Sequence, residues 1–262
     1  MTDIRLSPRG TNLKRILLTS AAVLTFFIST RLLNLELSKF FPRIGNAPAV
    51  IRRMITLDFA KCGEVFYAMG VSVALAFVAL IGGTLVSLVL AFLAAENIAP
   101  SRIIASFIKA VIAVIRAVPS LVWVLMVVAS IGFGNTGGMI GLIFPVTGYL
   151  TKSFAASVED LGDGLIEAMR SVGASWFDIV AKGIFPTVLP AFVGWIAIRL
   201  EANVAESISL GMVGVSGIGM LLARALKQYN YGRITFILLL IFLTMLLLEF
   251  GMNHVKKLIE SR

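Results

Sequence analysis

The sequence predicts an all-α polytopic membrane protein of about six transmembrane helices. Of its 262 residues, 58% are hydrophobic and 14% are charged, and the mean hydropathy is +0.96. Soluble domains are roughly half apolar and about a quarter charged, so this composition favours a bilayer. The length suits one compact domain. Several apolar runs also reach the roughly 20 residues that a helix needs to cross a hydrocarbon core.

Six apolar runs are the candidate spans. In chain order they cover residues 16–33, 65–95, 103–131, 138–157, 187–204 and 234–250. The first run follows four basic residues, Arg5, Arg9, Lys14 and Arg15, as a signal peptide would. The run is long for a signal peptide, however, and no small-residue cleavage pattern follows it, so we expect a retained helix.

The basic residues predict how the helices are oriented. An even number of spans places both termini on one side, and with the N-terminus inside, twelve Lys and Arg residues lie on the inner face and nine on the outer face. The basic loop 31–61 opposes this orientation. The net charge of +9 is scattered between apolar runs without a nucleic-acid motif, so we expect no nucleic-acid partner. The single cysteine, Cys62, excludes an internal disulfide.

A polar stretch at 158–186 interrupts the membrane segments. Acidic residues and glycines end the fourth span, and a short helix is then predicted at 165–172, with Glu167 and Arg170 facing water. Gly173 breaks this helix.

A second short helix is predicted to begin behind Ser175. Ser175 and Asp178 have the spacing of a capping box, and the helix is expected to run to about Lys182. Pro186 and Pro190 then restrict the chain where the fifth span begins. The result would be two short helices outside the bilayer, joined by a glycine elbow.

The apolar side chains of this loop predict a binding partner. They are too many for a solvated linker and favour docking into a partner's groove: Met169, Trp176, Phe177 and Ile179. The alternative is an amphipathic loop that lies on the membrane surface.

The spacing of Glu167, Ala168, Gly173 and Pro186 resembles the EAA loop of ABC importer permeases. The family pattern is Glu-Ala-Ala, three residues, Gly, nine residues, Ile, any residue and Leu-Pro. Three positions depart from it, where the family has Ala, Ile and Leu: Met169, Gly183 and Phe185.

Two further segments resemble the phosphonate permease branch of that family. They are RAVPSLVWVLM at 116–126 and RLEANVAESISLGMVGVSGIG at 199–219, and the last span is followed by Lys256 and Lys257. At Ala205 and Glu206 the sequence departs from that branch, which usually has a basic and then a small residue. This departure leaves the substrate open.

The resemblance implies a type I importer fold and its partners. It implies a second permease copy, two cytoplasmic ATPase subunits that bind ATP and Mg²⁺, and a periplasmic binding protein, with no cofactor in this chain. The chain would then lie in the cell inner membrane, with the EAA loop and both termini in the cytoplasm. The implied layout is an N-terminal helix and basic loop at 1–64, the permease domain at 65–256 with the coupling loop 158–186, and a basic tail at 257–262.

In the coupling loop, each residue of the motif has an expected role. We expect Gly173 to permit the elbow, Glu167 to make a polar contact with the ATPase, and Ala168 and Ala174 to allow close approach. Pro186 would mark the start of the following membrane helix. ATP-driven closure of the ATPases would then move the coupling loop as a rigid lever and repack the membrane helices.

Charges within the spans predict the translocation path, since ionised side chains are costly in lipid. Arg199 lies near mid-bilayer and Arg116 on the third span, and either could attract an anion. The other candidate lining residues are Ser120, Glu201, Asn203, Gly214, Gly217 and Gly219. The alternative is that both arginines neutralise carboxylates such as Glu201 or Glu206. Arg199 and Glu201 are two residues apart, so they cannot pair on one helical face.

The glycines at 211–219 do not form a nucleotide loop, because the spacing misses the known patterns. We expect an irregular segment where backbones come close, near the path or a gate. His254 is the only histidine, and neither a catalytic set nor a metal site is expected. The predicted function is import of a phosphorus oxyanion. One alternative is that the same kind of permease imports another small solute, such as an amino acid. The others are an ion-coupled secondary transporter and, last, a membrane enzyme.

Overall fold

The computed structural model describes residues 11–33, 41, 42 and 44–260, and these form helices joined by turns and short loops. Five of the basic residues used for orientation lie outside the described residues: Arg5, Arg9, Lys39, Arg43 and Arg262. The chain divides into two compact units, 1–53 and 54–262. Among the described helices, five are long and apolar enough to cross a membrane, or six if one bent pair counts as a span.

The N-terminal unit contains the first predicted span. Helix α1 covers Thr11–Leu32, and its part Leu13–Leu32 meets the length and composition of a membrane span. Helix α3, Ala47–Ile55, carries Arg52 and Arg53 in its last turn. The basic loop that argued against the predicted orientation therefore contains a short helix.

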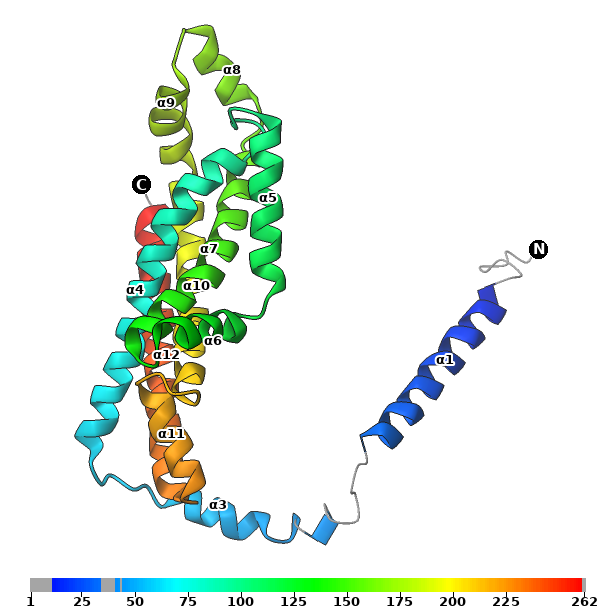
Figure 1. Ribbon diagram of the computed structural model, residues 1–262, viewed down its shortest axis with the longest axis vertical. Coiled ribbons are helices and arrows are strands. Elements are labelled where there is room, and N and C mark those ends of the chain that lie inside the picture. The colour runs from blue at the N-terminus through cyan, green and yellow to red at the C-terminus, as the bar shows by residue number, and fades with distance from the viewer. Residues whose placement is uncertain (1–10, 34–40, 43, 261–262) are drawn as a thin grey trace, which may run out of the picture. The chain divides into compact units, whose positions relative to one another are not determined.

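Four long helices form the bundle of the second unit (Figure 1). They are α4 (Cys62–Ala94), α7 (Asn135–Glu159), α10 (Phe185–Gly211) and α12 (Tyr231–Glu260). Helix α4 packs along α7 and α10. A Cβ atom at Gly83 would lie 2.3 Å from Val146 Cγ1, so glycine allows α4 and α7 this close approach. Between α7 and α10, the rings of Phe154 and Phe192 stack with centroids 4.0 Å apart.

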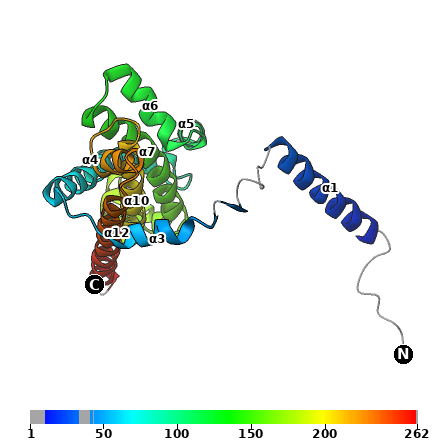
Figure 2. The ribbon, with the colours of Figure 1, turned by 90° about the horizontal axis from the view of Figure 1, so that it is seen from below.

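The third predicted span is not one helix. The chain forms α5 (Arg102–Ala117) and α6 (Ser120–Ile131), which meet at 89°. The prediction of a single helix over 103–131 is therefore wrong. Pro119 disfavours helical backbone at the preceding Val118, which is extended with ψ 127°. Helices α5 and α6 lie on one side of α7, and α12 lies on the other side of α10 (Figure 2).

The fifth predicted span is longer than expected. Helix continues from Trp176 to Gly211 through α9 (Trp176–Asp178), a π-helical turn η1 (Ile179–Ile184) and α10. The prediction of a separate second short helix ending near Lys182 is therefore wrong. In the wide turn, the Phe185 N–H donates to Val180 O, five residues back. This widening lets the helix pass Pro186, which has no N–H to offer a normal turn.

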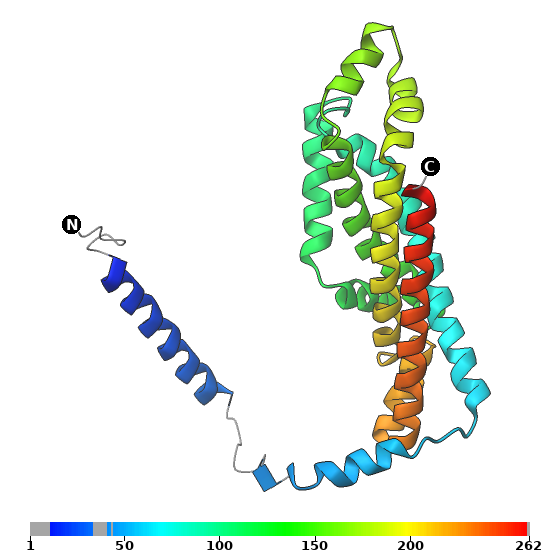
Figure 3. The same cartoon turned by 180° about the vertical axis from the view of Figure 1, so that it is seen from behind.

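The two ends of the bundle differ. Helix α8 (Gly164–Ser171) and the start of α9 project from one end, toward which α12 also runs (Figures 1 and 3). Helix α11 (Ile218–Lys227) lies at the opposite end, between the loop after α10 and the start of α12.

Candidate coupling elbow and translocation path

The elbow between α8 and α9 is built on Gly173. Its φ is +78°, in the left-handed region, and no atom lies within 4 Å of an added Cβ. Glycine is therefore required here by backbone conformation and not by space. The Ala174 N–H donates to Met169 O at 3.1 Å, a bond that closes the end of α8. Glu167 and Ala168 are both exposed on α8.

The predicted cap of the second helix is confirmed. The Asp178 N–H donates to Ser175 Oγ at 3.2 Å, and the Ser175 hydroxyl donates to Asp178 Oδ2 at 2.5 Å. Lys182 Nζ lies 2.6 Å from Asp178 Oδ1. These contacts fix the direction in which the chain leaves the elbow.

Part of the apolar surface predicted for a partner is covered within the chain. Ile179 is buried, and the Trp176 indole N–H donates to Ile98 O at 2.7 Å. Met169 is half-buried. Trp176 is still 39% exposed, and the most exposed apolar side chains of the elbow are Phe177 at 73% and Val172 at 83%. Val172 was not among the side chains predicted to contact a partner, although its position directly before the elbow glycine indicates exposure.

Two departures from the EAA pattern lie against each other. A Cβ at Gly183 would come within 2.3 Å of Met169 Sδ. Met169 stands where the pattern has a small residue, and Gly183 where it has a large one. The long side chain of one residue therefore fills the space that the other leaves open, which keeps α8 packed on η1.

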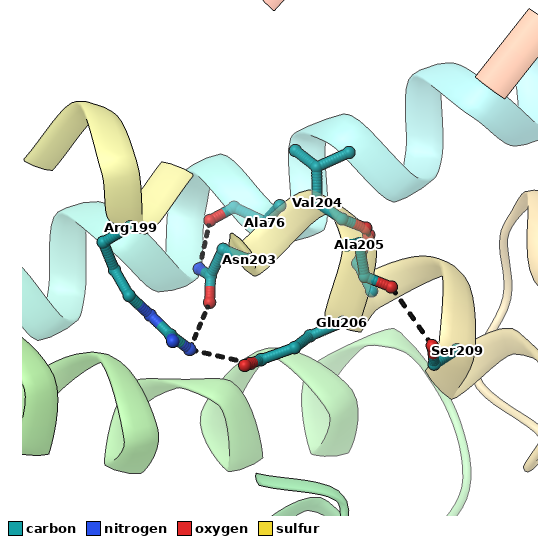
Figure 4. Close-up of polar contacts among 8 residues, drawn as sticks. Ala76, Arg199, Asn203, Val204, Ala205, Glu206 and Ser209 are labelled. Atoms are coloured by element: carbon teal, nitrogen blue, oxygen red, sulfur yellow. Dashed lines mark hydrogen bonds and ion pairs between the residues drawn. The ribbon is translucent and has the colours of Figure 1, made fainter. Parts of the chain in front are cut away.

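Arg199 is the centre of a buried polar network on α10 (Figure 4). Its guanidinium Nη2 lies 2.7 Å from Glu206 Oε2 and donates to Asn203 Oδ1 at 3.1 Å. Asn203 in turn donates to Ala76 O of α4 at 2.8 Å. The Arg199 Cζ also lies 5.9 Å from the ring centre of Tyr149 on α7. The network therefore joins three helices.

Arg199 is paired with a carboxylate, as the alternative reading expects, but this carboxylate lies on the same helix, α10. Its partner is Glu206, one of the two residues at which the sequence departs from the phosphonate branch. Arg199 Nε is buried and has no hydrogen-bond partner among the described residues. Glu201 is half-buried and forms no ion pair within the described chain.

A cavity of about 440 Å³ lies beside this network, between α6 and α10. Ser120, Glu206 and Ser209 supply its polar lining. Ser120, a predicted path residue, thus shares a cavity with the carboxylate that pairs with Arg199.

The glycine segment after α10 is irregular, as predicted. Gly214 and Gly217 have φ of +98° and +143°. A Cβ at Gly219 would lie 1.7 Å from Ile208 O, so backbones approach closely here. The Ile218 N–H donates to the buried Ser72 hydroxyl at 3.1 Å, which ties this segment to α4. Gly217 and Gly219 are buried, whereas Gly214 is exposed.

Arg116 lies apart from the other predicted path residues. It is exposed near the end of α5 and lines a different cavity, between α5 and α7, together with Lys109 and Lys152. In the described part of the chain, no three His, Cys, Asp or Glu side chains gather as metal ligands would.

The broken third span, the elbow and the glycine segment belong to a sequence that matches a known family. Residues 83–262 match the family model described as binding-protein-dependent transport system inner membrane component. The chain belongs to this family. It is therefore a membrane component of a transport system, and the predicted resemblance to importer permeases is confirmed.

Several curated relatives of this permease are named as transport proteins for phosphorus oxyanions, and others as methionine permeases. It is 33% identical over 210 residues to the phosphate-import permease protein PhnE of Mycolicibacterium smegmatis, a match that covers 80% of this chain and 39% of that protein. It is 26% identical to the putative phosphite transport system permease protein HtxC of Stutzerimonas stutzeri, covering 94% of this chain and 88% of that protein. The permease thus spans well under half of the mycobacterial relative's length.

The fold is also that of solved importer permeases. A structure of the MetNI methionine ABC transporter in an inward-facing conformation superposes with a TM-score of 0.71 at 21% identity, covering 78% of this permease and 99% of that chain. The predicted all-α, type I importer permease fold is confirmed.

Proposed function

We propose that this permease imports a phosphorus oxyanion, such as phosphonate, phosphite or phosphate, in an ATP-driven assembly. The assembly would contain a second permease copy, two cytoplasmic ATPase subunits that bind ATP and Mg²⁺, and a periplasmic binding protein. It would lie in the cell inner membrane with both termini in the cytoplasm. The names of the phosphate and phosphite permeases among the relatives support this substrate class.

The observation that carries the coupling role is the projecting elbow. Helix α8 leaves the bundle end, Gly173 reverses the chain, and Val172 and Phe177 present apolar side chains that the bundle does not cover. An exposed apolar pair at the tip of a short helix fits a groove on a partner protein.

In this proposal the remaining motif residues keep their expected roles. Glu167 makes a polar contact at the groove, and the small side chains of Ala168 and Ala174 allow close approach. Pro186 lies where the lever joins α10, so movement of the elbow reaches the helix that carries Arg199 and Asn203. The lever therefore connects directly to the proposed path.

The proposed path runs along α10 and the glycine segment and includes Arg116 of α5 and Ser120 of α6. Its residues are Arg116, Ser120, Arg199, Glu201, Asn203, Gly214, Gly217 and Gly219. The cavity lined by Ser120 and Glu206 would be one place along the path that the solute occupies. Gly217 and Gly219 would contribute by close backbone packing rather than by contact with the solute, since both are buried.

The test is ATP-driven uptake in proteoliposomes that contain the permease, its ATPase and its binding protein. Wild type is expected to take up labelled phosphate, phosphite or methylphosphonate only with ATP. Gly173→Val is expected to abolish uptake while membrane insertion persists, because a β-branched residue resists positive φ. Gly173→Asn, which tolerates that conformation, should keep much of the activity. Transport without ATP and ATPase would contradict the proposal, and full uptake by Gly173→Val would contradict the lever.

An amino acid is the second candidate substrate. The methionine permeases among the relatives support this alternative. Ligand binding to the capture protein separates the two classes: binding of an amino acid and not of an oxyanion would replace the first proposal with the second.

A further inference from the structure

The cavity between α5 and α7 has the size of a small-ligand site. Its volume is about 330 Å³, within the range of roughly 300 to 1,000 Å³ that is usual for such sites. From α5 it is lined by Lys109, Ile112, Ala113 and Arg116, whose spacing places them on one helical face. Alanines of α4, α5 and α7 leave the space open.

The polar lining of this cavity is mostly cationic. Lys109, Arg116 and Lys152 face a single carboxylate, Glu159. Lys109 is neutralised, because its Nζ lies 2.5 Å from Glu96 Oε1 and 2.9 Å from Glu159 Oε1. The hydrogen bond from Lys109 is also the main cause that lowers the pKa of Glu96, so this carboxylate stays ionised.

The other two cations are available for a ligand. Within the described residues, neither Arg116 nor Lys152 forms an ion pair. Both Glu96 and Glu159 are engaged by Lys109. Three cations against these two carboxylates leave the site net positive, and the two cations without an ion pair favour an anion.

A buried hydroxyl supplies a second, independent indication of a ligand. Thr151 lines the cavity, is 1% exposed, and its Oγ1 has no hydrogen-bond partner among the described residues. Helical threonines usually donate to the carbonyl of the preceding turn, as Thr187, Thr235 and Thr244 do here. The hydroxyls of Thr84 and Thr147 are also buried without a partner among the described residues, but Thr151 is the one of these three that lines this cavity. A buried polar group without a partner is costly, and the oxygen of a bound anion would accept the Thr151 proton.

We propose that this cavity binds a phosphorus oxyanion through Arg116, Lys152 and Thr151, and that the transported anion occupies it before it is released into the cytoplasm. This inference rests on the proposed function and adds a binding site to it. The cavity extends from the end of α5 next to α6 to the last residue of α7 next to α8. It therefore lies between the α6–α10 cavity and the bundle end that we assign to the cytoplasm.

The same chemistry could be offered by the phosphate of an anionic lipid headgroup, so the experiment separates the two sources. The complete transporter, with its ATPase and without nucleotide, is placed in nanodiscs of neutral phosphatidylcholine or of phosphatidylglycerol. Binding of radiolabelled inorganic phosphate is measured in both, and ATP-driven phosphate uptake is measured in proteoliposomes.

Wild type is expected to bind phosphate in both lipids. The Arg116→Gln/Lys152→Gln variant should bind at least about tenfold more weakly, since hydrogen bonds to ionised groups are the stronger ones. Thr151→Val should weaken binding, whereas Thr151→Ser keeps the hydroxyl and should retain it. Arg102→Gln is the matched control, because Arg102 is an exposed cation on the same helix outside the cavity. Co-purification of the ATPase checks that each variant is assembled, and Arg116→Lys retains the charge if the Gln variants do not assemble.

The outcomes distinguish the failures. If wild type takes up no phosphate, phosphite or methylphosphonate, the proposed function fails whatever the variants do. If wild type transports phosphate but the double variant and Thr151→Val bind and transport as wild type does, this site assignment is overturned. If phosphatidylglycerol displaces phosphate and the variants transport normally, the cavity holds a lipid headgroup and its assignment to the transported anion is overturned.

Discussion

At the scale of single residues, Met169 and Gly183 depart from the EAA pattern in opposite directions of size. The thioether of Met169 occupies the place where a side chain at 183 would project. Read separately along the chain, the two departures loosen the match to the family. Read together in space, they preserve the contact between α8 and η1.

This contact predicts a reciprocal pair of variants. Gly183→Ile alone should destabilise the protein by about 1–3 kcal/mol through overpacking against Met169. The double variant Met169→Ala/Gly183→Ile, which restores the pattern, should recover most of that loss. Unfolding of the purified permease in detergent measures both. Equal losses in the single and double variants would contradict the compensation.

Arg199 and Glu206 are a second pair at this scale. Both are in a membrane helix, and each leaves an unpaired charge if the other is removed. Glu206→Gln should therefore cost about 3 kcal/mol, at the lower end for a broken buried pair because 24% of the Glu206 side-chain surface stays exposed. Arg199→Met/Glu206→Met should cost less than either single change. A double-mutant cycle on the unfolding free energy checks this, and simple additivity would contradict it.

At the scale of elements, the break between α5 and α6 is held by Trp123. Its indole N–H donates at 2.9 Å to Ile115 O, near the end of α5. Its ring stacks on Phe144 of α7, with centroids 4.7 Å apart and planes 3° from parallel. The tryptophan thus satisfies a carbonyl that the break frees and fastens α6 to the bundle.

Removing only the hydrogen bond tests this role. Trp123→Phe keeps an aromatic ring next to Phe144 and should lower the unfolding free energy by about 1 kcal/mol, the usual net contribution of one hydrogen bond. Trp123→Leu, which also loses the stack, should cost more. Thermal unfolding in detergent ranks the stabilities of wild type, Trp123→Phe and Trp123→Leu. Equal stability of the three proteins would show that α6 is held by other contacts.

At the scale of the whole bundle, the proposed orientation can be tested with the native cysteine. Cys62 is exposed at the start of α4, at the end of the bundle opposite the elbow (Figure 1). A membrane-impermeant maleimide should label Cys62 in intact spheroplasts. In Cys62→Ser/Val172→Cys, produced without the ATPase so that the elbow is uncovered, it should label the elbow cysteine only in inverted vesicles. The reverse pattern would place the elbow outside the cytoplasm and remove its proposed contact with an ATPase.

The sequence by itself determined the membrane class, the places of most apolar segments, the cap at Ser175 and the glycine elbow. These features depend on local chemistry: apolar length, the side-chain cap and the conformational freedom of Gly173. Family membership was also within reach, since the EAA spacing is local.

Only the tertiary structure decided which of those residues meet. It joined Arg199 to Glu206, buried Ile179, and set Met169 against Gly183. It also left Arg116 and Lys152 without counter-charges next to Thr151. Pairing and covering depend on neighbours that the fold brings from other helices, and no local pattern specifies them. For the same reason the bend at Pro119 was missed: an apolar run of sufficient length does not reveal whether its two halves point the same way.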